Sequence, residues 1–253
     1  MQPKTNILNI PGAIIVAGAL VAVAIIWTQR APTVTAPQAA TLPTSKVDLA
    51  PVTAADHILG NPNAPIKIVE FSDPSCPYCK AFNPTMVQIM DEYGPSGNVA
   101  WVYRSFPLDK PDANGHILHP NAGHESQALE CAASLGGNDK FWAYEKELYT
   151  ITPSVTAQTP NGLDQSQLPK IAQDVGLDPA AFSACLSSGK FKAKVDASYT
   201  QGLNAGVNGT PTSFIITPAG SDIALPGAQP YSTIKNMIDS LLTEAPSQQA
   251  AAQ

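Results

Sequence analysis

The chain has 253 residues, of which 44% are hydrophobic, a length that suits one enlarged domain with appended segments better than two large domains. Its formal net charge is -6 and its 14 Lys and Arg residues are scattered, which argues against a nucleic-acid partner, because phosphate contacts require clustered positive charge. The four cysteines fall into a close pair, Cys76 and Cys79, and two distant residues, Cys131 and Cys185. What they do depends on the compartment in which the chain works.

The N-terminal residues indicate that compartment. Residues 10–27 form an uninterrupted apolar run after a short flank of residues 1–9. A bilayer core is crossed by about 20 apolar residues, whereas the apolar region of a cleaved signal peptide has about 7 to 15. The length favours a single-pass transmembrane anchor, with a long cleaved signal peptide as the alternative. In either case we expect the rest of the chain on the extracytoplasmic (periplasmic or external) side of the membrane.

Two segments of biased composition flank the predicted domain. Residues 28–53 are rich in Pro, Ala and Thr, and they predict an extended linker. Residues 245–253, rich in Ala and Gln, predict a disordered tail. The folded domain is therefore expected to cover residues 54–244.

The first half of the predicted domain is a strand, a helix and a strand. Residues 66–71 are a β-branched run after two turns and predict a buried strand. Apolar residues spaced by three or four predict a helix over residues 79–93, and residues 99–106 predict the second strand. This order predicts a βαβ unit with parallel strands.

A block of short helices follows, inserted at about residues 119–206. The predicted helices cover residues 125–135, 140–149, 165–175, 179–186 and 191–205. Two strands, at residues 212–217 and 223–225, and an amphipathic helix at residues 231–242 then close the domain. The order of elements predicts an α/β protein with a small mixed sheet between helices, which is a thioredoxin-like fold with an all-α insertion.

The motif Cys76-Pro77-Tyr78-Cys79 lies where the first predicted strand gives way to a helix. The free N–H groups of a helix N-terminus favour thiolate over thiol at Cys76. Cys79, one turn later, can close a disulfide after Cys76 has attacked a substrate. We therefore expect Cys76 to be the nucleophile and Cys79 the resolving thiol. Pro77 suits the first helical position, and Tyr78 is expected to face solvent and contact substrate.

A metal site is the alternative interpretation of these cysteines. A C-x-x-C pair is half of many zinc sites, and Cys131 and Cys185 could supply two further ligands, but zinc ribbons bring their cysteines as two close pairs. A redox pair without a metal or other cofactor is therefore favoured. A second possible metal cluster, His116, His119 and His124, is more simply explained by loop and cap positions.

Glu70 is an acid in the middle of the first apolar strand. A buried carboxylate costs energy unless it has a partner or a role. Its side chain could lie beneath the cysteine pair, with a pKa raised by burial, and take the proton of the resolving thiol. The alternative is that Glu70 points to solvent or pairs with Lys67.

The bond between Thr210 and Pro211 precedes the predicted strand at residues 212–217. An X-Pro bond at a strand entrance is a candidate for the cis form, although a trans turn is the default for a single proline. A cis Pro211 would bring the backbone of Thr210 near the sulfur pair. That backbone could then pair with an extended substrate segment.

With these motifs the chain resembles the DsbA-like, thioredoxin-fold family, in its branch of anchored bacterial disulfide oxidoreductases. The matching stretches are residues 56–80, 101–108 and 207–215 and the segment FWAYEKELY. The resemblance implies an exported enzyme in which Cys76 attacks, Cys79 resolves, Glu70 is the buried acid and Pro211 is cis.

Two positions depart from the best-known strong oxidases of that family, which have His in place of Tyr78 and Val in place of Thr210. The resemblance therefore implies the reaction class more firmly than the direction of electron flow. Cys131 and Cys185 both fall in the predicted insertion. In an oxidising compartment we expect a structural disulfide between them, with two reduced thiols or an auxiliary redox pair as alternatives.

The predicted function is thiol–disulfide exchange with exported proteins, chiefly disulfide formation, with reoxidation by a DsbB-like or VKOR-like quinone reductase in the membrane. One alternative is a reductase or isomerase of the same fold that a membrane donor keeps reduced. Another, from a different class, is a non-catalytic thioredoxin-like binding module or chaperone. The chain has no long heptad region, so we expect a monomeric catalytic domain.

Overall fold

The computed structural model describes residues 47–153, 162–217 and 219–251. The predicted flank and membrane span at residues 1–27 lie outside these residues, as does the predicted linker as far as residue 46. Within the described part, no helix combines the length and the apolar character needed to cross a bilayer.

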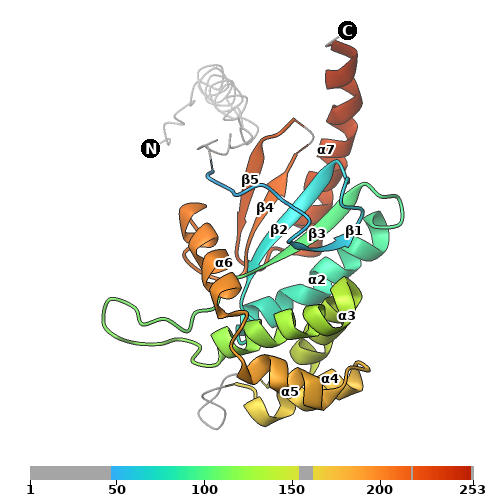
Figure 1. Ribbon diagram of the computed structural model, residues 1–253. Coiled ribbons are helices and arrows are strands. Elements are labelled where there is room, and N and C mark those ends of the chain that lie inside the picture. Colours follow the sequence, from blue (N-terminus) through green and yellow to red (C-terminus); the bar gives the residue numbers. More distant parts are fainter. Residues whose placement is uncertain (1–46, 154–161, 218, 252–253) are drawn as a thin grey trace, which may run out of the picture. The chain divides into compact units, whose positions relative to one another are not determined.

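The described residues form one five-stranded mixed sheet with the strand order β1-β3-β2-β4-β5 (Figure 1). The strands are β1 (His57–Gly60), β2 (Ile66–Ser72), β3 (Val99–Ser105), β4 (Thr212–Ile216) and β5 (Asp222–Pro226). Strands β2 and β3 are parallel, and the other neighbouring pairs are antiparallel. The predicted βαβ unit and mixed sheet are confirmed, whereas the edge strand β1 was not predicted.

Helices cover both faces of the sheet. The crossover helix between β2 and β3 is α2 (Pro77–Tyr93), and α7 (Tyr231–Ala251) follows the last strand. The insertion consists of α3 (Ala122–Ile151), the short 3-10 helix η1 (Gln165–Gln167), α4 (Leu168–Asp174), α5 (Pro179–Ser187) and α6 (Lys192–Asn204). The predicted thioredoxin-like fold with a helical insertion is therefore observed.

Alternating side chains of the central strands divide the interior into two cores. Ile68 of β2 and Trp101 of β3 belong to the larger core, which takes in residues of α2, α3, α4, α5 and α7. Val69 and Phe71 point to the other face, where a smaller core includes Phe214 and is covered by α6. Because both faces are covered, nearly all side chains of β2 and β3 are buried.

Helix α3 joins two helices that the sequence predicts separately, at residues 125–135 and 140–149. At Gly137 the backbone has φ 76° and ψ -172°, which is not helical. Only glycine adopts this conformation readily, so Gly137 sets the break between the two halves. The first half is fixed to α5 by a disulfide between Cys131 and Cys185, whose Cα atoms lie 5.9 Å apart.

Helix α7 extends beyond its predicted end at residue 242 and continues to Ala251. The prediction of a disordered tail was therefore wrong for residues 245–251. Ala and Gln are good helix formers, which favours extension of a helix that has already been nucleated, whereas Pro246 within the extension opposes it.

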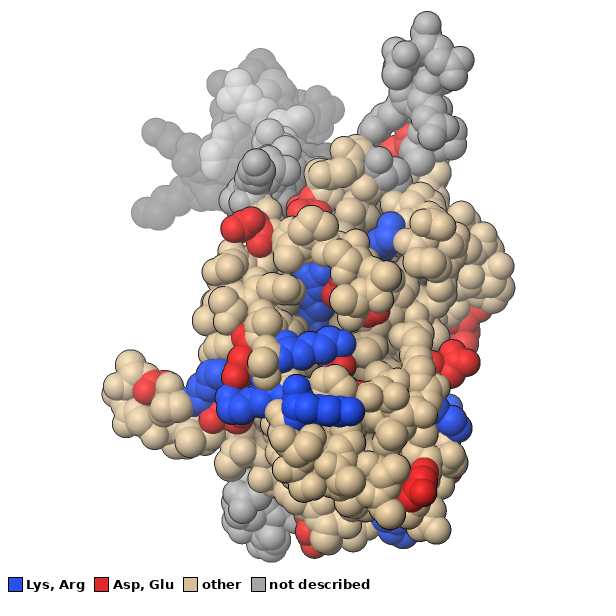
Figure 2. Space-filling view, viewed as in Figure 1, with Lys and Arg blue, Asp and Glu red and all other residues tan. Residues whose placement is uncertain are grey.

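Basic side chains gather on the face that α6 covers (Figure 2). In the described residues, Lys110 and Lys192 both pair with Asp196, and Lys194 pairs with the buried Glu130. These positive charges are balanced locally.

Candidate active site

The turn after β2 places Cys76 at the N-terminus of α2. The backbone N–H of Cys76 donates to the Asp73 carbonyl at 3.0 Å, and Cys76 is the N-cap residue, with Pro77 at the first helical position. The Cys76 residue is 3% exposed and Cys79, one turn further, is fully buried. Both are free thiols in this structure, so the geometry is that of the reduced protein.

The environment of Cys76 favours its thiolate. A hydrogen bond with Cys79 is the main cause that lowers the pKa of the Cys76 thiol from 9.0 to about 6, and Thr210 contributes in the same direction. Burial opposes these effects without cancelling them. About half of Cys76 is therefore ionised near pH 6, which makes it the nucleophile of the pair.

Cys79 behaves in the opposite way. Burial, followed by the neighbouring Cys76 and by the charge on Glu70, raises the pKa of the Cys79 thiol well above 9.0. The backbone N–H of Asp73 points to the Cys79 sulfur at 3.5 Å. Cys79 is thus held as a protonated thiol until it loses its proton to a base.

The peptide bond between Thr210 and Pro211 is cis. It places the Thr210 carbonyl 3.4 Å from the Cys76 sulfur, which donates a hydrogen bond to it. Tyr78, on the outer side of the motif, is 68% exposed. The Thr210 backbone therefore borders the Cys76 sulfur, and an extended chain beside Thr210 would lie against Cys76.

Glu70 lies in the interior beneath the cysteine pair and is 2% exposed. Its Oε2 accepts a hydrogen bond from Trp101 Nε1 at 2.9 Å. Burial raises the pKa of Glu70 from 4.5 to about 7. The alternative pairing with Lys67 is not observed, because the Lys67 amino group donates to the Ala64 carbonyl.

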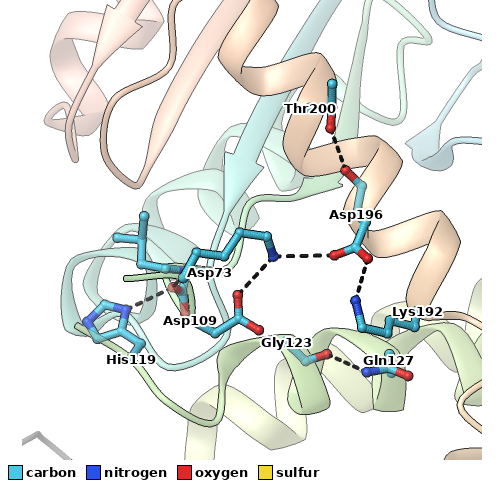
Figure 3. Close-up of polar contacts among 10 residues, drawn as sticks. Asp73, Asp109, His119, Gly123, Gln127, Lys192, Asp196 and Thr200 are labelled. Atoms are coloured by element: carbon cyan, nitrogen blue, oxygen red, sulfur yellow. Dashed lines mark hydrogen bonds and ion pairs between the residues drawn. The ribbon is translucent and has the colours of Figure 1, made fainter. Parts of the chain in front are cut away.

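Asp73, which no sequence motif marked, organises the turn that carries Cys76. Its Oδ1 accepts the backbone N–H of Ser75 at 2.7 Å, and its Oδ2 accepts that of Leu108 at 2.8 Å. His119 Nδ1 lies 2.8 Å from the same Oδ2 (Figure 3). A turn-forming Asp before Pro74 was a recognisable signal, whereas nothing in the sequence connects His119 with this turn.

Residues 107–121 therefore form a loop whose base is fastened beside the active site. A second fastening is Lys110, whose amino group binds Asp109 Oδ1 at 3.1 Å and Asp196 Oδ1 at 3.3 Å, linking the loop to α6 (Figure 3). Of the three histidines considered as a metal cluster, His119 interacts with Asp73 instead. In the described residues no group of three or more His, Cys, Asp and Glu side chains is placed to hold a metal ion.

The insertion contacts the active-site turn through Glu125, on the first turn of α3. Ser75 donates its hydroxyl to Glu125 Oε2 at 2.6 Å, and Gln165 Nε2 donates to Oε1 at 2.8 Å. Burial raises the pKa of Glu125. No local sequence pattern indicates this contact, because the three residues come from distant segments.

This arrangement defines a class of protein: one with a thioredoxin-like fold and a paired-thiol site at the start of its crossover helix. The sequence model of the family described as Thioredoxin matches residues 52–239. The chain belongs to the thioredoxin family.

Individual relatives agree with this assignment. Alpha-DsbA1 of Wolbachia pipientis has a similar fold, with a TM-score of 0.65 and 22% identity over 78% of this chain and 96% of that one. The "probable disulfide bond formation protein D" of Bacillus anthracis is 27% identical over 62% of this chain and 68% of that protein.

Other relatives are much longer proteins, of which only a part matches this chain. The Na(+)/H(+) antiporter NhaA 1 of Mycolicibacterium gilvum (strain PYR-GCK) is 28% identical over 162 residues, which make up 63% of this chain and 23% of the antiporter. The chain thus spans about a quarter of the length of that relative. The 162 aligned residues cannot include the antiporter as a whole.

Proposed function

We propose that this protein is a thiol:disulfide oxidoreductase that forms disulfides in exported proteins through a mixed disulfide at Cys76. The observation that carries the proposal is the contrast within the pair: Cys76 has a pKa of about 6, while the pKa of Cys79 is raised well above 9.0. A stabilised Cys76 thiolate favours the reduced protein and makes its disulfide oxidising. The likeness to the Bacillus anthracis protein supports the same reaction class.

The reaction follows from the geometry of the two sulfurs. A substrate thiolate attacks the Cys76 sulfur of the oxidised pair, and Cys79 leaves as a thiolate that takes up a proton from Glu70. A second substrate thiolate then attacks the mixed disulfide, and Cys76 leaves as its stabilised thiolate. The cis Pro211 holds the Thr210 backbone beside Cys76, where it can align the substrate.

The experiment that tests the proposal is oxidation of a reduced, unfolded protein by the oxidised 253-residue chain. The wild-type protein is expected to introduce disulfides, and Cys76→Ser to be inactive. Cys79→Ser is the matched control: it lacks the disulfide of the pair and is also inactive in this assay, but it keeps the nucleophile and is expected to accumulate a mixed disulfide when it is given a disulfide-containing peptide, which Cys76→Ser does not. If the wild-type protein introduced disulfides no faster than Cys76→Ser, the protein would be a binding module or chaperone instead.

The direction of electron flow is tested by the reduction potential of the pair in glutathione buffers. Reference values are about -270 mV for thioredoxin and about -120 mV for DsbA. We expect a value nearer the DsbA end because of the Cys76 thiolate. A value near that of thioredoxin would instead support a reductase or isomerase, and Tyr78 and Thr210 would then be the first residues to examine.

The proposed location is the outer side of a cell membrane, with residues 10–27 as a single-pass anchor and a DsbB-like or VKOR-like membrane partner for reoxidation. The uncharged apolar run supports the anchor. Fractionation of cells that express the full chain tests it: anchored protein stays with membranes in alkaline carbonate. Release of a shortened chain that starts after the run would show a cleaved signal peptide.

A further inference from the structure

Helix α3 places a second buried carboxyl beside the redox pair. Glu145 is 2% exposed, as is Glu70. Its Oε1 accepts a hydrogen bond from Asn83 Nδ2 at 2.6 Å, and Asn83 lies one turn after Cys79 on α2. No ion pair in the described residues involves Glu145. A carboxylate in this position is costly, so the environment favours the protonated acid.

The groups around Glu145 come from each element packed against it. Glu70 lies near it from β2, Tyr103 from β3, Asn83 from α2, and Tyr149 from the next turn of α3 itself. Burial, and then the charge on Glu70, raise the pKa of Glu145 well above 4.5. None of these groups carries a positive charge.

Tyr103 adds a buried hydroxyl to this group of side chains. Its hydroxyl responds to charge on Glu145, Cys79 and Glu70, which places all three within electrostatic reach of it. Burial raises the pKa of Tyr103 well above 10.0, and Tyr149 acts on it in the opposite direction, as a neighbouring hydroxyl.

We propose that Glu145 acts with Glu70 as a second buried acid, whose proton restores Glu70 after Glu70 has protonated the Cys79 sulfur. This inference rests on the proposed oxidoreductase function and deepens it. Glu145 does not touch the reacting sulfurs and works through Glu70.

The steps balance as follows in the direction of disulfide formation. A bond forms between the substrate sulfur and Cys76, the bond between Cys76 and Cys79 breaks, and its electron pair stays on the Cys79 sulfur. That sulfur takes the proton of the Glu70 carboxyl, which becomes a carboxylate. The proton of Glu145 then moves to Glu70, and Glu145 regains one from solvent. No electron passes through either carboxyl.

The benefit of a pair lies in its range of pH. Two interacting acids release their protons in two separate steps, and the first ionisation makes the second more difficult. Glu70 has a pKa of about 7, so alone it would hold little proton at alkaline pH. The pair still holds one proton there.

Glu145→Gln tests the proposal, because Gln keeps an oxygen for Asn83 but cannot supply the proton. The matched control is Glu130→Gln, which changes another buried glutamate of α3 that instead faces His57 and Lys194. The rate of oxidation of a reduced dithiol peptide by each oxidised 253-residue protein is measured against pH. Division by the wild-type rate at the same pH removes the ionisation of the peptide.

The Glu145→Gln ratio is expected to be near 1 at about pH 6 and to fall by roughly tenfold by about pH 8, as a single acid with the pKa of Glu70 ionises. The Glu130→Gln ratio should not change with pH. A Glu145→Gln ratio that is constant across the range would overturn the inference and leave Glu145 with a packing role.

An infrared measurement on the wild-type protein does not depend on whether the variants fold. The C=O stretch of a buried protonated carboxyl is expected to persist above pH 7, in wild type and in Glu130→Gln, and to be lost in Glu145→Gln. Absence of this band from the wild type would overturn the inference and leave the proposed function standing. If the wild type oxidised the peptide no faster than Cys76→Ser at any pH, both the proposed function and the inference about Glu145 would fail.

Discussion

The two thiols of the C-x-x-C motif differ in pKa because α2 begins between them. Cys76 lies outside the first helical turn and keeps contact with the Thr210 carbonyl, whereas Cys79 lies inside the helix and points into the core. Each sulfur also alters the other, because a thiol at Cys79 can donate to a thiolate at Cys76. The titration of the pair is therefore a joint property.

Cys79→Ala tests this dependence. Removing the hydrogen-bond donor should move the pKa of Cys76 from about 6 back toward 9.0, because that bond is the largest cause of the shift. The ultraviolet absorbance of the thiolate in the reduced protein, followed against pH, measures it. Cys79→Ser keeps a donor and should shift the midpoint less. An unchanged midpoint in Cys79→Ala would show that the helix N-terminus alone sets it.

Glu70→Gln is expected to change how stability depends on pH. Because the pKa of Glu70 is raised from 4.5 to about 7 on folding, its contribution is full below pH 4.5 and is lost as pH rises through 7. The difference amounts to about 3 kcal/mol. Urea unfolding of the oxidised proteins at both ends of this pH range should show that the variant loses less free energy of unfolding than the wild type. Parallel losses in the two proteins would refute the raised pKa.

Individual site residues differ in how far the sequence could predict them. The C-x-x-C motif, the acid in an apolar strand and the Thr-Pro bond before a strand are local patterns, and they led to Cys76, Cys79, Glu70 and Pro211. His119, Glu125 and Glu145 come from a loop and a helix far along the chain. Only the packing of the insertion against β2 and α2 brings them to the site, so no local pattern could reveal them.

At the scale of elements, the insertion contributes side chains that pack against the active site. Helix α3 contributes Glu125 at its start and Glu145 in its second half, on either side of the break at Gly137. Segments with a clear period of three to four residues were predicted correctly as helices. Strand β1 was missed because His57–Gly60 is too short for a pattern and is ordered by pairing with β3.

The disulfide between Cys131 and Cys185 should stabilise this insertion. Replacing both cysteines by Ala is expected to lower the free energy of unfolding by about 3 to 4 kcal/mol, since the cross-link restricts the unfolded chain. Chemical denaturation measures the loss, and the thiolate midpoint of Cys76 should stay unchanged as a control. A shifted Cys76 midpoint or lost oxidase activity in the folded variant would instead indicate an auxiliary redox pair.

At the scale of the whole domain, the order of strands and helices was enough to predict the fold, because a βαβ unit and a following antiparallel pair leave few ways to build one sheet. The start of the domain was harder to place. Val47, Leu49 and Val52 pack against the smaller core, although their segment has the Pro-rich composition of a linker. Composition alone could not show this, because the contacts are made across the sheet.

Arg104 is the residue that fastens this segment to the domain. It is 4% exposed, and its guanidinium donates to the carbonyls of Ala50 and Pro51 at 2.9 and 3.0 Å and to the Asp56 carboxylate at 2.8 Å. Removal of residues 47–53 would break the two bonds to Ala50 and Pro51 and leave the bonds to Asp56 in place. Hydrogen bonds to a buried charged group contribute about 1.5 to 3 kcal/mol each.

A chain that begins at residue 54 should therefore be less stable than one that begins at residue 47. We expect a loss of about 3 kcal/mol or more, from two broken bonds to Arg104 and from the exposure of the smaller core. Urea unfolding of the two oxidised fragments measures it, and Arg104→Met in the longer fragment should reproduce part of the loss. The pH midpoint of Cys76 ionisation should be the same in both fragments, because residues 47–53 cover the sheet face away from α2. Equal stabilities would mean that residues 47–53 belong to the linker after all.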